Sequence, residues 1–183
     1  MNSALCAKNP KTARFGREIP DESTAAEGTD GQGTRTREQT MFIGEYSHSL
    51  DAKGRVTIPA KFREELGETF VVTRSLDQCL TVYDMDAWEE FSRKLTELPY
   101  NSPEQRKLVR FFLSGAAEVE PDKMGRILLP QSLRSFAGID RDVVLVGSGA
   151  RIEIWSKENW EENTSAEEIG RIAEKMLGEG FMI

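Results

Sequence analysis

The chain has 183 residues and a formal net charge of −7, and 38% of its residues are hydrophobic and 30% charged. This length is enough for one or two domains with a hydrophobic core. No apolar run approaches the roughly 20 residues that a membrane-spanning helix needs, which excludes an integral membrane protein. Two cysteines cannot build a disulfide framework, so we expect a cytoplasmic protein.

Residues 1–40 differ in composition from the rest of the chain. They carry six basic and six acidic residues, and their large apolar residues are Leu5, Phe15 and Ile19. Such a segment cannot bury enough apolar surface to offset the entropy cost of ordering it, so we predict a disordered N-terminal extension. Two explanations stay open: a start codon assigned upstream of the true one at Met41, or a genuine disordered arm. A secretory signal is excluded because no apolar core is present.

The remainder of the chain contains a duplicated unit. Residues 51–59 read DAKGRVTIP and residues 122–130 read DKMGRILLP, an offset of 71 residues. After one added residue the match continues, with Trp88 corresponding to Trp160. The boundaries we predict are a first unit at 41–90, linking helices at 91–116, a second unit at 117–162, and a C-terminal helix and tail at 163–183.

Each copy predicts the same turn. An Asp side chain can bond to the backbone of the residues after it, and Gly supplies a positive φ. We therefore assign structural turn roles to Asp51, Gly54, Asp122 and Gly125. The sequence after each turn predicts a short strand, and Pro59 or Pro130 then opens a short helix within its first turn.

The pattern predicts the following elements: strands at 56–58, 69–73, 79–83, 127–129, 143–146 and 151–155, and helices at 60–66, 86–95, 101–113, 131–137 and 165–177. Gly147 to Gly149 marks the second hairpin. One unit alone exposes strand edges and barely makes a core. We therefore expect one pseudo-symmetric α+β domain, mainly β, in which each unit covers the edge of the other.

The paired aspartates raise the possibility of an enzyme. Aspartic proteases pair one carboxylate from each half, and the two share a proton. Here Lys and Arg follow both Asp51 and Asp122, and such cations favour two separately ionised carboxylates. The single histidine and two distant cysteines offer no metal-ligand cluster. We expect no catalytic residue, no metal and no cofactor; a hydrolase built on Asp51 and Asp122 is the competing interpretation.

The two turn-strand-helix segments are basic within an acidic chain. Each has one acid, against four basic residues in 46–63 and three in 122–134. Solvated surface charge is the ordinary explanation, but recurrence at equivalent sites favours DNA binding, with Lys on phosphates and Arg on phosphates or guanine edges. The candidate DNA-binding residues are Lys53, Arg55, Lys61, Arg63, Lys123 and Arg126. One protomer offers few contacts, so specific binding needs several protomers.

Four segments together resemble the MraZ family. They are residues 41–45 (MFIGE), 48–63 (HSLDAKGRVTIPAKFR), 111–116 (FFLSGA) and 122–130 (DKMGRILLP). The resemblance covers residues 41–160 and implies tandem AbrB-like swapped-hairpin units that form a pseudo-dimer within one chain, with flanking helices. It leaves residues 1–40 outside the family.

The resemblance also implies a function. MraZ proteins are sequence-specific DNA-binding regulators that form rings of about eight protomers. They bind repeated promoter boxes of the division and cell wall gene cluster, which implies a repressor here, in the cytoplasm and associated with the nucleoid. Lys53 and Arg55 become the leading candidates for DNA contact, whereas Lys123 and Arg126 could instead serve subunit contacts. A ring-forming scaffold that binds protein without specific DNA readout is the alternative.

Overall fold

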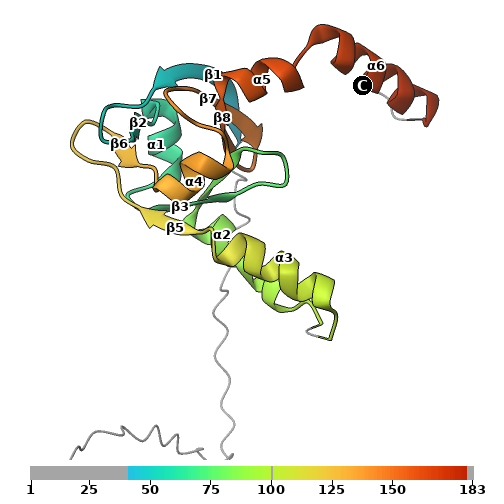
Figure 1. The fold of residues 1–183 in the computed structure, drawn as a ribbon, viewed down its shortest axis with the longest axis horizontal. Helices are drawn as coiled ribbons and strands as arrows, with labels where there is room; N and C mark the ends of the chain where they lie inside the picture. The colour runs from blue at the N-terminus through green and yellow to red at the C-terminus, as the bar shows by residue number, and fades with distance from the viewer. Residues whose placement is uncertain (1–40, 100, 181–183) are drawn as a thin grey trace, which may run out of the picture. The chain divides into compact units, whose positions relative to one another are not determined.

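The duplicated sequence folds as two units with the same order of elements (Figure 1). A computed structural model describes residues 41–99 and 101–180, so the predicted disordered extension at 1–40 lies outside the described residues. The first unit comprises β1 (Phe42–Ser49), β2 (Arg55–Thr57), α1 (Ala60–Leu66), β3 (Phe70–Arg74), β4 (Leu80–Asp84) and α2 (Met85–Thr96). Then come α3 (Pro103–Leu113), β5 (Ala117–Val119), β6 (Arg126–Leu128), α4 (Gln131–Phe136), β7 (Asp142–Gly149), β8 (Ile152–Ser156), α5 (Lys157–Asn163) and α6 (Ala166–Gly178).

The two units exchange strands in one antiparallel sheet, whose order is β1-β7-β8-β4-β3-β5. The first strand of each unit pairs with the third strand of the other unit: β1 pairs with β7, and β5 pairs with β3. At the centre, β4 pairs with β8. This arrangement confirms the predicted fold class, a mainly β α+β chain in which swapped hairpins form an intrachain pseudo-dimer, and each unit covers an edge of the other.

A second ladder joins the units through β2 and β6, and Val56 lies opposite Ile127 in its middle. Both of these side chains are fully buried, and they belong to one core cluster to which both units contribute. The cluster includes the equivalent pairs Ile58 and Leu129, and Phe62 and Leu133. Because this core extends across the two units, each unit depends on the other for burial of its apolar surface.

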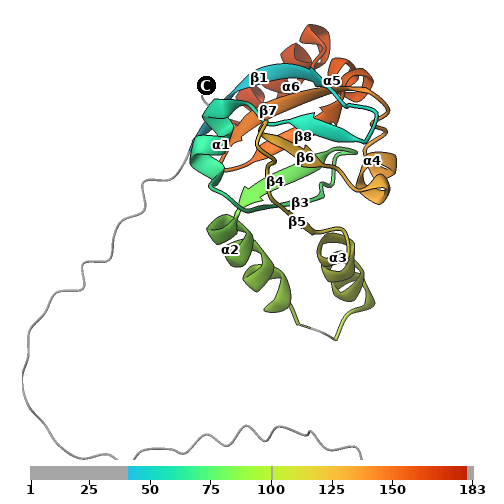
Figure 2. The ribbon, with the colours of Figure 1, turned by 90° about the vertical axis from the view of Figure 1, so that its left-hand side faces the viewer.

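The helices follow the predictions closely. Helix α1 has the predicted bounds, and α4 ends one residue earlier than predicted. Pro59 and Pro130 immediately precede these helices, with extended backbone, instead of occupying the first turn. Helices α2 and α3 lie side by side (Figure 2), where Phe91 meets Phe112 edge to face at 5.2 Å between ring centroids. No helix in the described part of the chain is both long and apolar enough to cross a bilayer.

The structure corrects the predicted position of the second hairpin. Gly147 and Gly149 lie in β7, and the turn follows at residues 150 and 151. Gly147 is needed for close approach, because a Cβ there would lie 2.4 Å from the backbone nitrogen of Ile43 in β1. The sequence did not predict β1, β5 or α5 as separate elements. Both strands are paired by residues of the other unit, so local patterning carries little signal for them.

Candidate nucleic-acid interface

The first Asp-x-x-Gly-Arg turn is closed by its own aspartate. Oδ1 of Asp51 accepts hydrogen bonds from the backbone nitrogens of Lys53 at 2.9 Å and Arg55 at 3.0 Å. The Gly54 nitrogen donates to the Asp51 carbonyl at 2.8 Å, and Gly54 has a φ of 77°. This is the Asx-type turn with a left-handed glycine that the sequence predicts.

The second turn repeats this geometry. Oδ1 of Asp122 accepts from the backbone nitrogens of Met124 at 2.9 Å and Arg126 at 3.0 Å. Gly125 has a φ of 72°. The two turns are therefore equivalent in backbone structure, and they differ in the side chains that they present.

Each arginine is held by the aspartate of its own turn. Nε and Nη2 of Arg55 lie 2.7 and 2.6 Å from Oδ2 of Asp51. Nε and Nη2 of Arg126 lie 2.9 and 2.7 Å from Oδ2 of Asp122. The four side chains are between 27% and 33% exposed. Because Nε and Nη2 of each arginine both contact the same carboxylate oxygen, the orientation of each guanidinium is fixed.

The two turns also meet each other across the β2–β6 ladder. Nη1 of Arg55 lies 3.4 Å from Oδ2 of Asp122, and Nη1 of Arg126 lies 3.7 Å from Oδ2 of Asp51. We call these four residues the Asp–Arg cluster. Every guanidinium nitrogen in the cluster faces a carboxylate.

The cluster opposes a shared-proton pair of aspartates. Hydrogen bonds from Arg55 lower the pKa of the Asp51 carboxyl from 3.8 to about 2, and Arg126 does the same for Asp122. A proteolytic dyad needs one carboxyl with a raised pKa. The direction of both pKa shifts therefore opposes the hydrolase interpretation. Among residues 41–99 and 101–180, no group of His, Cys, Asp and Glu side chains could hold a metal ion.

A second pair of arginines supports the turns from the opposite unit. Nε of Arg63 in α1 donates to the Ile58 carbonyl at 3.1 Å, and a Cβ added to Gly125 would lie 2.7 Å from that Nε. Arg134 in α4 repeats the contact at Gly54, where the corresponding separation is 3.1 Å. Each helix thus packs an arginine on the turn of the other unit, so Arg63, a candidate DNA-binding residue, has a structural role as well.

The exposed side chains around the cluster distinguish the two turns. Lys53, Lys61 and Lys123 are exposed. Met124, which occupies the position of Lys53 in the second turn, is 69% exposed, and Leu128, opposite Arg55 in the ladder, is 56% exposed. Each turn therefore presents one lysine, but in the second turn Lys123 stands one position earlier and is followed by an exposed apolar side chain. An alignment of the two copies of the repeat would have shown, from the sequence alone, that Leu128 differs from the residue at the equivalent position of the first copy.

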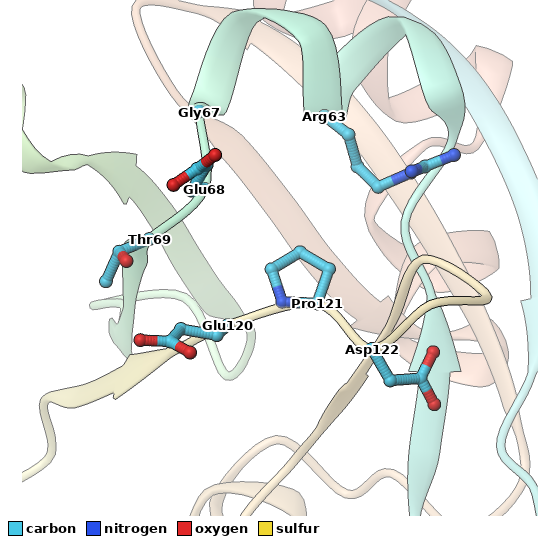
Figure 3. Close-up of a pocket in the computed structure, with 7 residues that line it drawn as sticks. All are labelled: Arg63, Gly67, Glu68, Thr69, Glu120, Pro121 and Asp122. Atoms are coloured by element: carbon cyan, nitrogen blue, oxygen red, sulfur yellow. The ribbon is translucent and has the colours of Figure 1, made fainter.

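A hollow of about 580 Å³ lies between the end of α1 and the second turn (Figure 3). The carboxylates of Glu68 and Glu120 lie at one end of it, and Arg63 and Asp122 lie at the other. Three acids against one arginine make this hollow unfavourable for a phosphate. The hollow beside the turns is therefore not suited to an anionic partner.

The sequence matches one protein family over most of its length. The family described as "MraZ protein, putative antitoxin-like" matches residues 41–111 and again residues 112–177. The two matches divide the chain between the two structural units.

Similar full-length proteins are known from several bacteria. A "Transcriptional regulator MraZ" of Acetivibrio thermocellus is 54% identical over 141 residues, which cover 74% of this chain and 96% of that protein. Proteins with the same name from Syntrophomonas wolfei subsp. wolfei and Moorella thermoacetica are each 52% identical, over 77% and 75% of this chain and 100% and 97% of their own lengths.

Proposed function

This chain belongs to the MraZ family, and we propose on that premise that it is a DNA-binding transcriptional regulator. The name shared by its relatives supports this function. The observation that carries the proposal is the pairing of two basic Asp-x-x-Gly-Arg turns on one ladder of an acidic chain. A protein that binds nucleic acid nonspecifically through its overall charge would not need that local arrangement.

We propose that the first turn makes the main contact with double-stranded DNA. Lys53 is exposed and its ammonium forms no ion pair with another described residue, so it is free to approach a phosphate. Arg55 reads a guanine edge after it exchanges its carboxylate partners for the base. Lys61 adds a phosphate contact. In the second unit, Lys123 contacts phosphate at the margin. Arg63 of the first unit and Arg126 of the second hold the turns in position.

We further propose that several protomers act together. A single turn neutralises few phosphates, whereas a ring of about eight protomers places several turns on direct repeats. The ring acts as a cytoplasmic, nucleoid-associated repressor on repeated promoter boxes of the division and cell wall gene cluster. Regulation of that cluster, the ring and the sign of regulation rest on the family resemblance.

Fluorescence anisotropy tests this function. The full chain and a form that begins at Met41 are titrated with the chain's own upstream promoter DNA and a scrambled duplex across a salt series. We expect a preference of about 10³-fold or more for the promoter. Lys53→Ala weakens both complexes and reduces the slope of log affinity against log salt concentration by about one for each first turn that contacts DNA. The control Lys94→Ala, on an exposed part of α2, leaves binding unchanged.

Two outcomes would contradict the proposal. Equal weak binding to both duplexes would leave only a nonspecific electrostatic surface. Absence of binding to either duplex, with an oligomer still present by light scattering, would favour the alternative, a ring-forming scaffold that binds protein.

A further inference from the structure

The C-terminal helix has an apolar face that the described structure leaves uncovered. Ile169, Ile172, Met176 and Leu177 follow helical spacing on α6, each is at least 39% exposed, and no residue of α6 is buried. A surface helix with a strong apolar stripe gains stability by burying that stripe against another element. Within the described chain α6 does not do so.

A second uncovered apolar surface lies between α3 and the loop that joins β3 to β4. Leu76, Leu108 and Phe111 line a pocket of about 390 Å³ there, together with Glu104 and Lys107. Leu76 is 73% exposed and Leu108 is 38% exposed. We call this surface the α3 pocket. Its apolar lining has the size to accept side chains such as those of the α6 face.

One residue that lines the α3 pocket is a cation, Lys107, and two further cations lie next to lining residues: Arg74 against Phe111, and Arg110 in α3. The Arg74 guanidinium lies 5.7 Å from the ring centroids of Phe111 and Phe136, and its buried Nε has no hydrogen-bond partner among the described residues. Neither Arg74, Lys107 nor Arg110 forms an ion pair with another residue of the described chain. Glu104 is the one carboxylate that lines the pocket. The surroundings of the pocket are therefore suited to an acidic partner.

The C-terminal segment supplies the opposite charge. Residues 157–179 contain seven acidic and three basic residues. Glu174, in α6, and Glu179, which caps its C-terminal end, form no ion pair with another described residue. Pairing of two α6 helices would bring two acidic segments together, whereas docking in the α3 pocket brings acids to cations.

We propose that the α6 face of one copy of this chain docks in the α3 pocket of a second copy. The two surfaces differ, so the contact is heterologous: each copy uses both surfaces, and successive contacts build a closed ring or an open filament. The inference rests on the proposed function to the extent that a DNA-bound oligomer needs such a contact, and it names the residues that make it.

Cysteine cross-linking tests this interface directly. The full chain with Cys6→Ser serves as background, because burial raises the pKa of Cys79 to about 12 and keeps its thiol unreactive. Differently tagged chains with Met176→Cys and Leu108→Cys are co-expressed and treated with a short bismaleimide. We expect a covalent mixed dimer from this pair and at least a tenfold lower yield when Arg171→Cys, on the opposite side of α6, replaces Met176→Cys.

Two cross-linking results would overturn the proposal. A covalent dimer from Met176→Cys alone would indicate pairing of α6 with α6. When one chain carries both Met176→Cys and Leu108→Cys, a cross-link confined to the monomer would indicate that α6 folds back on its own chain.

Light scattering provides an independent measurement. Ile172→Glu should reduce the oligomer to the monomer mass, whereas Arg171→Glu leaves the mass unchanged, and both variants should keep the parent far-UV circular dichroism spectrum because α6 buries no residue within its own chain. An unchanged mass for Ile172→Glu would contradict the interface. Promoter binding reports separately on the proposed function: mixed cross-links without DNA binding would support the interface and contradict the regulator.

Discussion

Arg55 of the first unit lies 3.4 Å from Asp122 of the second, from Nη1 to Oδ2, although 67 residues separate them in the chain. Arg126 approaches Asp51 in the reciprocal way. The duplication thus produces a four-residue cluster with no net charge, in which each arginine is bound by two carboxylates. A DNA phosphate or base must compete with those carboxylates, and this competition provides a means of rejecting DNA that lacks the right base contact.

Removing one carboxylate should therefore weaken sequence discrimination. Asp122→Asn keeps an oxygen that can accept the backbone hydrogen bonds of its turn, but it removes a charge that faces Arg55. We expect tighter binding to scrambled DNA and a promoter preference several-fold lower than in the parent chain. Anisotropy titrations on the two duplexes measure both quantities.

Asp140→Asn is the matched control, because Asp140 is an exposed acid outside the cluster. It changes the net charge by the same amount and should leave the promoter preference unaltered. If both variants affect scrambled DNA equally, total charge rather than the cluster sets discrimination.

The two arginines should contribute unequally to DNA binding. Lys53 lies two residues before Arg55, whereas the apolar Met124 holds that position before Arg126 and the lysine of the second turn, Lys123, stands one residue earlier. We expect Arg55→Ala to reduce promoter affinity by at least tenfold and Arg126→Ala to reduce it much less, with oligomer mass unchanged in both. A larger loss for Arg126→Ala would place the main contact on the second turn.

Much of this geometry follows from the sequence. Asp51 and Gly54 define a turn by local chemistry, since one side chain accepts two backbone bonds and the other residue tolerates a positive φ. Local spacing likewise predicts the bounds of α1. The duplication supplies the pseudo-symmetry, and with it the expectation that each unit covers an edge of the other.

The contacts between the units could not be predicted in this way. Nothing near Asp122 in the sequence shows that Arg55 approaches it, because that contact depends on the register of β2 against β6. The same holds for Arg63 on Gly125, and for β1, whose partner strand lies about 100 residues away in the chain. Pairing between residues that are distant in the chain determines these features, and local propensity does not predict such pairing.

The cluster should make stability depend on pH in the acid range. The pKa values of Asp51 and Asp122 are lowered to about 2 by hydrogen bonds from Arg55 and Arg126. Each carboxylate therefore stabilises the folded chain fully above about pH 4, and this stabilisation is lost as the pH falls toward about 2. Urea unfolding across that range should show a steep decrease in the free energy of unfolding.

The double variant Asp51→Asn/Asp122→Asn tests the assignment of this pH dependence. It cannot titrate at either position, so its free energy of unfolding should fall less steeply between about pH 4 and about pH 2 than that of the parent chain. Parallel curves would show that other carboxylates cause the acid sensitivity.

Alanine at either turn glycine should lower the Tm, and Gly125 should be more sensitive than Gly54, because an added Cβ would lie 2.7 Å from an arginine at Gly125 and 3.0 Å at Gly54. Gly125→Ala places a Cβ at a φ of 72° and 2.7 Å from the Arg63 guanidinium. Gly138→Ala is the control, because Gly138 has a φ of 64° and the atom nearest to the added Cβ, Nδ2 of Asn159, lies at an ordinary contact distance of 3.8 Å. Left-handed backbone alone costs an alanine about 1–2 kcal/mol, or roughly 2–8 °C in Tm. We expect Gly138→Ala to show this loss and Gly125→Ala a larger one, because Arg63 must also leave the turn. Equal losses in calorimetry would mean that Arg63 moves aside without cost and does not support the turn.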